Sequence, residues 1–276
     1  MSLFEAIILG IVQGLTEFLP ISSSAHLLMV PWIAGWTEPP FVFDTSLHIG
    51  TLIALLIYFR TDIINLLVSF IRLLKEKNIK ENPDGRLAVL IIIGSIPAGL
   101  IGFLFENIIE KKLHSPYIIV TTLIVLGIFL WLIDRLSKKT RTLEGITVKD
   151  AIVIGIAQAM ALIPGTSRSG ITMTAALLMN FNRETAARFS FLLSIPITAA
   201  AALFKLKDLL KMNMTSEVIT NFSVGILVSG IVGFLCIKYL LKFLRTNSFA
   251  VFAIYRIIVG LFLLFMAPGI KIENLE

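Results

Sequence analysis

The chain has 276 residues, of which 57% are hydrophobic and only 15% are charged. A soluble domain is typically about 45–50% apolar and about 25% charged, so the composition excludes an ordinary soluble protein and indicates a multi-pass membrane protein. The net charge of +6 fits lysines and arginines in loops beside a membrane. No basic stripe with interleaved aromatics is present, so we expect no nucleic-acid partner. The single cysteine, Cys236, excludes an intramolecular disulfide.

The first apolar segment, residues 3–34, predicts two part-length helices joined by a polar bend. Gly10 and Gly14 are four residues apart, so on a helix they share a face that a neighbouring helix can approach closely. Pro20 ends the first helix, and the serines at 22–24 are candidate N-caps for the second. Neither helix has the about 20 residues needed to cross a bilayer. We therefore expect a re-entrant hairpin whose bend is buried in protein or lines a cavity.

Three candidate spans follow the hairpin. They cover residues 44–59, which continue as an amphipathic stretch over 63–76, and then 87–109 and 116–133. After a basic loop the same order of segments begins again.

The restart predicts an internal duplication. The matches are residues 155–164 with 10–20, the span 189–204 with 44–59 at an offset of 145, and Gly230-x-x-Gly233 with Gly99-x-x-Gly102 at an offset of 131. A last span covers 249–266. We place repeat 1 at about 1–140 and repeat 2 at about 148–270 of one membrane domain. Chance matching between apolar runs is the alternative explanation.

Each half would hold one hairpin and three spans, and three is odd, so the second half would enter the membrane upside down. The predicted fold is all-α, with inverted-topology repeats. If the N-terminus is outside, fifteen basic residues fall in inner loops and six in outer segments, which favours this orientation. The inner ones are Arg72, Lys75, Lys77, Lys80, Arg86, Arg135, Lys138, Lys139, Arg141, Lys149, Arg183, Arg188, Lys238, Lys242 and Arg245. The outer ones are Lys111, Lys112, Lys205, Lys207, Lys211 and Lys271.

Both bends carry polar residues where the surroundings are apolar, over residues 13–26 and 164–170. Polar groups at membrane depth are costly and mark functional sites. Hairpins entering from opposite faces can meet near the midplane. Two helix N-termini and the guanidinium of Arg168 would then form an anion site suited to a phosphate. Glu17 is the expected resting partner of Arg168; a purely structural ion pair is the alternative.

Ser23 and His26 lie one helical turn apart and close to Glu17. Either is a candidate nucleophile toward phosphorus, with the other group or Glu17 moving protons; direct attack by water stays open. A packed histidine is the alternative for His26. His48 and His114 have no such neighbours in the sequence, and we predict that they are packed.

Glu17 is also a candidate ligand for a divalent metal that bridges to phosphate oxygens, with Gln13 as a weaker oxygen ligand. Gln13 and Gln158 occupy matching repeat positions, so we expect at least one to be a packing element. Several hydroxyls at the bends have a capping or back-bonding alternative. They are Ser22, Ser24, Ser167, Ser169 and Thr172.

The motifs Q-x-x-x-E at 13–17, FLPISSSAH after it, and PGTSRSGIT at 164–172 resemble those of the undecaprenyl-diphosphate phosphatase family, the bacitracin-resistance proteins of bacteria. The resemblance covers essentially the whole chain. The family pattern begins with Glu or Gln, and this sequence has the glutamine form at Gln13.

The resemblance implies hydrolysis of undecaprenyl diphosphate, a polyprenyl diphosphate lipid, to the monophosphate and inorganic phosphate, which recycles the cell-wall lipid carrier. It implies a divalent cation, Mg²⁺ or Ca²⁺, and a bacterial cytoplasmic (inner) membrane protein whose site opens to the outer face. The implied catalytic residues are Glu17, Ser23, His26 and Arg168, and the implied substrate-binding residues are Gln13, Ser22, Ser167, Ser169 and Thr172. A secondary transporter or lipid flippase is the alternative function, because inverted repeats with broken helices are typical of transporters. Whether the chain forms a homodimer is left open.

Overall fold

A computed structural model describes residues 1–276 apart from 38, 77–80, 113–114, 210–214 and 267–276. The described chain is helical throughout, which confirms the predicted all-α membrane class. Its α-helices are α1 (Leu3–Thr16), α2 (Ser23–Ala34), α3 (Phe41–Tyr58), α4 (Arg60–Glu76), α5 (Pro83–Lys112), α6 (Pro116–Leu136), α7 (Val148–Met160), α8 (Arg168–Leu178), α9 (Arg183–Leu209), α10 (Ser216–Leu244) and α11 (Ala250–Met266). A short 3₁₀ turn, η1 (Leu143–Gly145), precedes α7.

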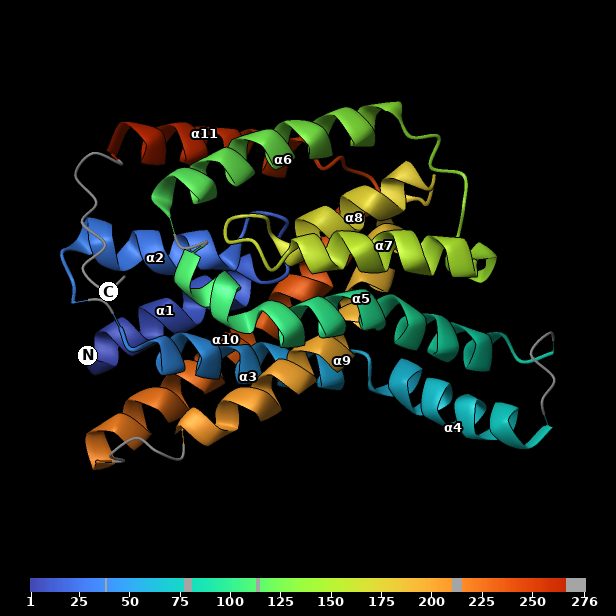
Figure 1. The fold of residues 1–276 in the computed structure, drawn as a ribbon, viewed down its shortest axis with the longest axis horizontal. Helices are drawn as coiled ribbons and strands as arrows, with labels where there is room; N and C mark the ends of the chain where they lie inside the picture. Colours follow the sequence, from blue (N-terminus) through green and yellow to red (C-terminus); the bar gives the residue numbers. More distant parts are fainter. Residues whose placement is uncertain (38, 77–80, 113–114, 210–214, 267–276) are drawn as a thin grey trace.

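Two pairs of short helices form the predicted hairpins, α1 with α2 and α7 with α8. Figure 1 shows them entering from opposite ends of the long axis, with their breaks facing each other at the centre. α1 ends at Thr16 rather than beside Pro20. The helix ends there because Pro20 has no N–H to donate to the carbonyl of Thr16, four residues earlier, and its ring crowds that carbonyl. Residues 17–21 form turns instead.

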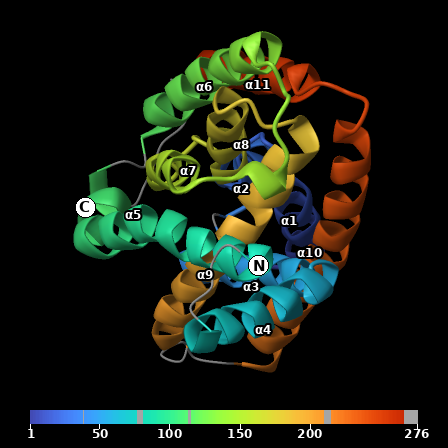
Figure 2. The ribbon, with the colours of Figure 1, turned by 90° about the vertical axis from the view of Figure 1, so that its right-hand side faces the viewer.

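Longer helices surround the hairpins. Viewed along the long axis, α5, α6, α10 and α11 lie around α1, α2, α7 and α8 (Figure 2). The hairpin helices are short yet their polar breaks lie inside protein, which is the condition under which a membrane tolerates an interrupted helix.

Within the described part of the chain, four helical segments are long and apolar enough to cross a membrane on their own: Pro83–Phe105, Pro116–Leu136, Arg183–Phe204 and Ser216–Leu244. The predicted span over 44–59 corresponds to α3, which meets α4 at a bend of 75°. The amphipathic continuation is thus a separate helix that turns away from α3. α11 is apolar but has only 17 residues. The count of three spans per half therefore depends on counting α3 and α11.

The first helix of each hairpin packs closely, backbone against backbone, on one of the longer helices. α1 packs along α10, and α7 packs along α5. A Cβ atom added to Gly10 would lie 2.7 Å from the carbonyl oxygen of Gly225, and one added to Gly155 would lie 2.3 Å from that of Gly94. Both positions therefore exclude any side chain, as the predicted close approach at Gly10 required. The two contacts use residues 145 and 131 apart in sequence, the offsets of the proposed duplication, which itself stays a prediction.

Charged residues join the loops at the end of the molecule opposite the N-terminus. Arg183 binds Asp134 through Nε at 2.7 Å and Nη2 at 3.2 Å. Arg141 binds both carboxylate oxygens of Asp150, at 2.9 and 2.6 Å. These pairs hold the α6–α7 and α8–α9 connections together, so the basic loops predicted to face the cytoplasm share one end of the fold.

Candidate active site

A serine at each hairpin break has a positive backbone φ. The angle is 78° at Ser22 and 68° at Ser167. Non-glycine residues seldom adopt such angles, and those that do concentrate at functional sites. Each serine is the N-cap of the helix that follows, α2 or α8. The breaks therefore turn sharply and present the free N–H groups of two helix starts at the centre.

Glu17, at the C-terminal end of α1, lies at the centre of a hydrogen-bond cluster. Its Oε1 accepts from Nη2 of Arg168 at 2.5 Å, and its Oε2 accepts from Oγ of Ser23 at 2.9 Å and from Nε2 of Gln13 at 3.0 Å. The carboxylate side chain is only 7% exposed. A charge buried to this degree needs a partner, and Arg168 supplies it. The predicted contact between Glu17 and Arg168 is confirmed.

Backbone groups also join the two breaks. The N–H of Gly165 donates to Oγ of Ser24 at 3.3 Å, and Oγ of Ser169 donates to the carbonyl of Leu19 at 3.1 Å. These bonds connect residues about 140–150 positions apart in sequence. The predicted meeting of the two bends is therefore present in the fold.

Arg256, on α11, is a site residue that sequence reasoning missed. It is 1% exposed. Its guanidinium donates to five backbone carbonyls, which belong to Pro20, Thr122, Leu123, Gly165 and Thr166. The acceptors come from both hairpin breaks and from α6, so Arg256 holds the two halves of the site in register.

Replacing Arg256 with methionine should destabilise the protein strongly. The carbonyls of Pro20, Gly165 and Thr166 lie at the hairpin breaks and would lose this donor. Each unsatisfied buried group costs about 1–3 kcal/mol, so we expect a loss of at least about 3 kcal/mol. Unfolding in detergent, followed by circular dichroism, measures this. The matched control is Arg135→Met, an exposed position on α6, where we expect a change within about 0.5 kcal/mol. Equal losses in the two variants would contradict the proposed role of Arg256.

His26 is 4% exposed, and both of its ring nitrogens have a hydrogen-bond partner. Its Nδ1 lies 2.6 Å from the carbonyl oxygen of Ser22, and its Nε2 lies 2.7 Å from the hydroxyl of Tyr255. Since a carbonyl only accepts, Nδ1 carries the proton that it donates to Ser22. Ser23 bonds instead to Glu17, so the described contacts do not join Ser23 and His26 into the predicted pair.

His48, on α3, lies in the cluster, so the prediction that it is only packed is wrong. Its Nδ1 is 2.9 Å from Nε2 of Gln13 and 3.4 Å from Oε2 of Glu17. The His48 side chain is 35% exposed, far more than that of Glu17. His114 lies outside the described residues.

The remaining predicted site hydroxyls support the breaks. Thr172 is fully buried, and its Oγ1 bonds to the carbonyl of Arg168 at 2.7 Å and to Oγ of Ser190 at 2.6 Å. Oγ of Ser167 accepts from the N–H of Gly170 at 3.1 Å. Oγ of Ser22 lies 3.2 Å from Oγ of Ser24. Ser167 therefore caps α8 and Thr172 bonds back to its own helix, as in the alternative that we stated, whereas Ser22 makes no side-chain capping bond. A role in substrate binding stays a prediction for each.

The side-chain oxygens of Glu17 and Gln13 suit a cation that the protein and a substrate bind together. The described residues contain no group of three His, Cys, Asp or Glu side chains that could hold a metal. Two oxygens are nonetheless available, the carboxylate of Glu17 and Oε1 of Gln13, which is buried without a hydrogen-bond partner. Mg²⁺ is usually bound by one or two carboxylates together with phosphate oxygens. Gln13 and Glu17 therefore fit such an ion.

Comparison with known proteins identifies the family. The family described as "Bacitracin resistance protein BacA" matches residues 6–262. The chain belongs to the BacA family. A protein of Moorella thermoacetica named undecaprenyl-diphosphatase is 49% identical over 260 residues, which cover 94% of this chain and 96% of the relative.

Two further BacA relatives carry the same name. The protein of Pelobacter propionicus is 47% identical over 261 residues, covering 94% of this chain and 95% of its own length. The protein of Thioalkalivibrio sulfidiphilus is 46% identical over 266 residues, covering 96% and 99%. The BacA family match includes both hairpins and therefore the whole Glu17 cluster.

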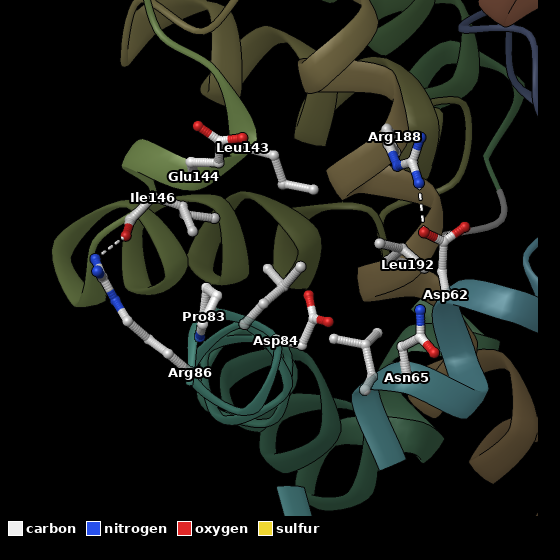
Figure 3. Close-up of a pocket in the computed structure, with 12 residues that line it drawn as sticks. Asp62, Asn65, Pro83, Asp84, Arg86, Leu143, Glu144, Ile146, Arg188 and Leu192 are labelled. Atoms are coloured by element: carbon white, nitrogen blue, oxygen red, sulfur yellow. Dashed lines mark hydrogen bonds and ion pairs between the residues drawn. The ribbon is translucent and has the colours of Figure 1, made fainter. Parts of the chain in front are cut away.

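A cavity lies at the end of the fold that carries the basic loops, here called the basic end, and it is separate from the Glu17 cluster (Figure 3). It is bounded by α4, α5, η1 and α9. Arg188 pairs there with Asp62, and Arg86 donates to the carbonyl of Ile146. The residues around the cavity include no member of the Glu17 cluster, so it is separate from the candidate active site.

Proposed function

We propose that the chain hydrolyses undecaprenyl diphosphate to undecaprenyl phosphate and inorganic phosphate. The observation that carries the proposal is the chain of contacts from Ser23 through Glu17 to Arg168, formed where the two hairpin breaks meet. A hydroxyl on a carboxylate, next to a guanidinium and two helix N-termini, is an arrangement for attack on a phosphate. The names of the BacA relatives support the same substrate.

The diphosphate would bind at the starts of α2 and α8. Arg168 has a second nitrogen, Nη1, that is buried and has no partner. A guanidinium that already binds Glu17 through Nη2 can donate from Nη1 to a phosphate oxygen, and the planar group suits two-point binding. The N–H groups at both helix starts add positive potential at the same place.

In the proposed step, Oγ of Ser23 attacks the terminal phosphorus and its proton passes to Oε2 of Glu17, 2.9 Å away. The bond between that phosphorus and the bridging oxygen breaks, and undecaprenyl phosphate leaves with the electron pair. Water then attacks the phosphoserine, the Ser23 oxygen takes a proton back, and inorganic phosphate leaves. Trapping a phosphoserine at residue 23 would separate this route from direct attack by water.

His26 would hold the break in shape from its buried position between Ser22 and Tyr255. Glu17 and Gln13 would hold a divalent cation, Mg²⁺ or Ca²⁺, which would offset the negative charge of the diphosphate. The Glu17 carboxylate accepts three hydrogen bonds, two at Oε2 and one at Oε1, and a carboxylate has about four acceptor positions, so Oε1 keeps one for a cation.

Phosphate release from undecaprenyl diphosphate in detergent micelles tests the function. We expect release by the intact protein with Mg²⁺ or Ca²⁺, and loss of release on adding EDTA, because the diphosphate charge is then left without a cation. Replenishing the metal should restore it, and release unchanged by EDTA would contradict the metal's part. Micelles have no compartments, so a pure transporter or flippase would show no release at all.

We also propose that the two halves are inverted repeats with both termini outside, so that the site opens to the outer face of the membrane. Cysteine labelling in a Cys236→Ala background tests this, because Cys236 is buried. Ser2→Cys should react with a membrane-impermeant maleimide on intact cells, and Thr140→Cys only after permeabilisation. Both positions are exposed on the fold. The reverse pattern would overturn the orientation.

A further inference from the structure

Two buried polar atoms in the Glu17 cluster have no hydrogen-bond partner. One is an acceptor, Oε1 of Gln13, and the other is a donor, Nη1 of Arg168. Gln13 is 0% exposed. A buried polar group without a partner costs about 1–3 kcal/mol, and because these two belong to side chains that both bind Glu17, we attribute them to a ligand missing from this cluster. An unpaired donor suits a phosphate oxygen, and an unpaired acceptor suits a cation; together they match a metal–diphosphate complex.

The orientation of the Gln13 amide depends on His48. Nε2 of Gln13 lies 3.0 Å from Oε2 of Glu17 and 2.9 Å from Nδ1 of His48. The amide NH₂ donates to Glu17 and, when His48 is the neutral tautomer with its proton on Nε2, also to Nδ1 of His48. With the amide turned over, its oxygen would face the Glu17 carboxylate oxygen at 3.0 Å, which is repulsive. The two acceptors thus use both N–H groups and leave Oε1 on the opposite side of the amide.

We propose that His48 is a positioning residue that turns the Gln13 amide so that Oε1 serves as a ligand for the divalent cation; this rests on the proposed function. An orienting partner is needed because position 13 holds an amide and not a carboxylate. A carboxylate presents two equivalent oxygens and needs no orienting partner. An amide presents one oxygen and must be turned, and His48 supplies the second acceptor that does so.

The proposal predicts a coupling between positions 13 and 48. His48→Leu should weaken metal binding by about tenfold or more, as expected for loss of a group that orients a metal ligand. His48→Asn should restore most of it, because Oδ1 of asparagine stands near the place of Nδ1 and also accepts. In a Gln13→Glu background, His48→Leu should have little effect.

Binding of Mn²⁺ to the detergent-solubilised protein, measured by electron paramagnetic resonance with methylenediphosphonate present, gives a readout other than activity. Gln158→Leu is the matched control. It removes the glutamine at the corresponding place in α7, whose amide atoms are also buried without partners, and it should leave Mn²⁺ affinity unchanged. In phosphate-release assays, His48→Leu should raise the Mg²⁺ concentration for half-maximal rate while kcat at saturating Mg²⁺ stays near the wild-type value.

Three results would overturn the role of His48: wild-type affinity for Mn²⁺ in His48→Leu, an asparagine variant as weak as the leucine variant, or no Mn²⁺ binding by the wild type. Thermal unfolding of each variant shows whether the fold is intact, and the double variant with Gln13→Glu repeats the test in a second background. Failure of the proposed function looks different. The wild type would then bind Mn²⁺ in the expected His48-dependent way yet release no phosphate.

Discussion

Replacing Arg168 with lysine should lower kcat/KM for phosphate release by about 10²–10³-fold, the loss typical when a preorganised charged donor is removed. Lysine keeps the positive charge but has a single ammonium. It can pair with Oε1 of Glu17 or reach a phosphate, whereas the guanidinium offers Nη2 for the first and the buried, unpartnered Nη1 for the second. Steady-state phosphate release in detergent measures the effect.

The control for this change is Arg141→Lys. Arg141 also binds a carboxylate through two nitrogens, on Asp150, but it lies in the loop before α7 at the basic end. We expect kcat/KM in that variant to stay within about twofold of the wild-type value, since surface and loop substitutions have small effects. Wild-type turnover in Arg168→Lys would contradict the phosphate-binding role, and a similar loss in both variants would point to a general structural effect.

Replacing Glu17 with glutamine should lower kcat by about 10²–10⁴-fold, the range over which a positioned base contributes to proton transfer. The amide keeps the size of the side chain but accepts protons poorly. It also leaves the guanidinium of Arg168 buried without a counter-charge, and breaking a buried pair costs about 3–5 kcal/mol of stability. Two measurements are therefore needed, phosphate release and unfolding in detergent.

A double variant separates the two effects of Glu17→Gln. In Glu17→Gln with Arg168→Met the unpaired charge is gone, so most of the stability should return while phosphate release stays low. Full activity in Glu17→Gln would contradict the assignment of Glu17 as the base for Ser23. Stability unchanged in Glu17→Gln would show that the charge of Arg168 is compensated by other groups.

The two helix breaks could be predicted because their signals are local. Pro20 and the serines at 22–24 mark one break, and the run Pro164–Gly170 marks the other. We expected the two breaks to meet, and Glu17 to contact Arg168, from the predicted inverted-topology repeat. The predictions of the two breaks rest on local effects, because proline ends a helix and serine hydroxyls cap one. These effects act over a few residues and can therefore be recognised from a single sequence.

His48, Tyr255 and Arg256 could not be assigned in the same way. Each lies on a largely apolar helix, and its partners come from segments that lie far away in sequence. An isolated arginine in an apolar span is itself a signal, because ionisable residues at membrane depth are costly. That signal shows that Arg256 matters but does not reveal which carbonyls it binds.

The pairing of Ser23 with Glu17 depends on a backbone detail that no pattern in the sequence reveals. Ser22 adopts a φ of 78°, which turns the chain so that Ser23 reaches the carboxylate while His26 is directed to Tyr255. Ser23 and His26 still lie one turn apart on α2, but the direction that Ser22 gives to this helix brings Glu17 to Ser23 and Tyr255 to His26. Non-glycine residues in this region are uncommon enough that the prediction could not anticipate it.

The five carbonyl contacts of Arg256 bear on any cycle of alternating access. Rocking one hairpin away from the other would pull Pro20 apart from Gly165 and Thr166, and a single guanidinium on α11 ties all three. Such a movement would take hydrogen-bond acceptors away from the buried guanidinium of Arg256 unless other acceptors replaced them at the same time. A hydrolase needs no such movement, because its substrate can enter and its products can leave on the same side of the site.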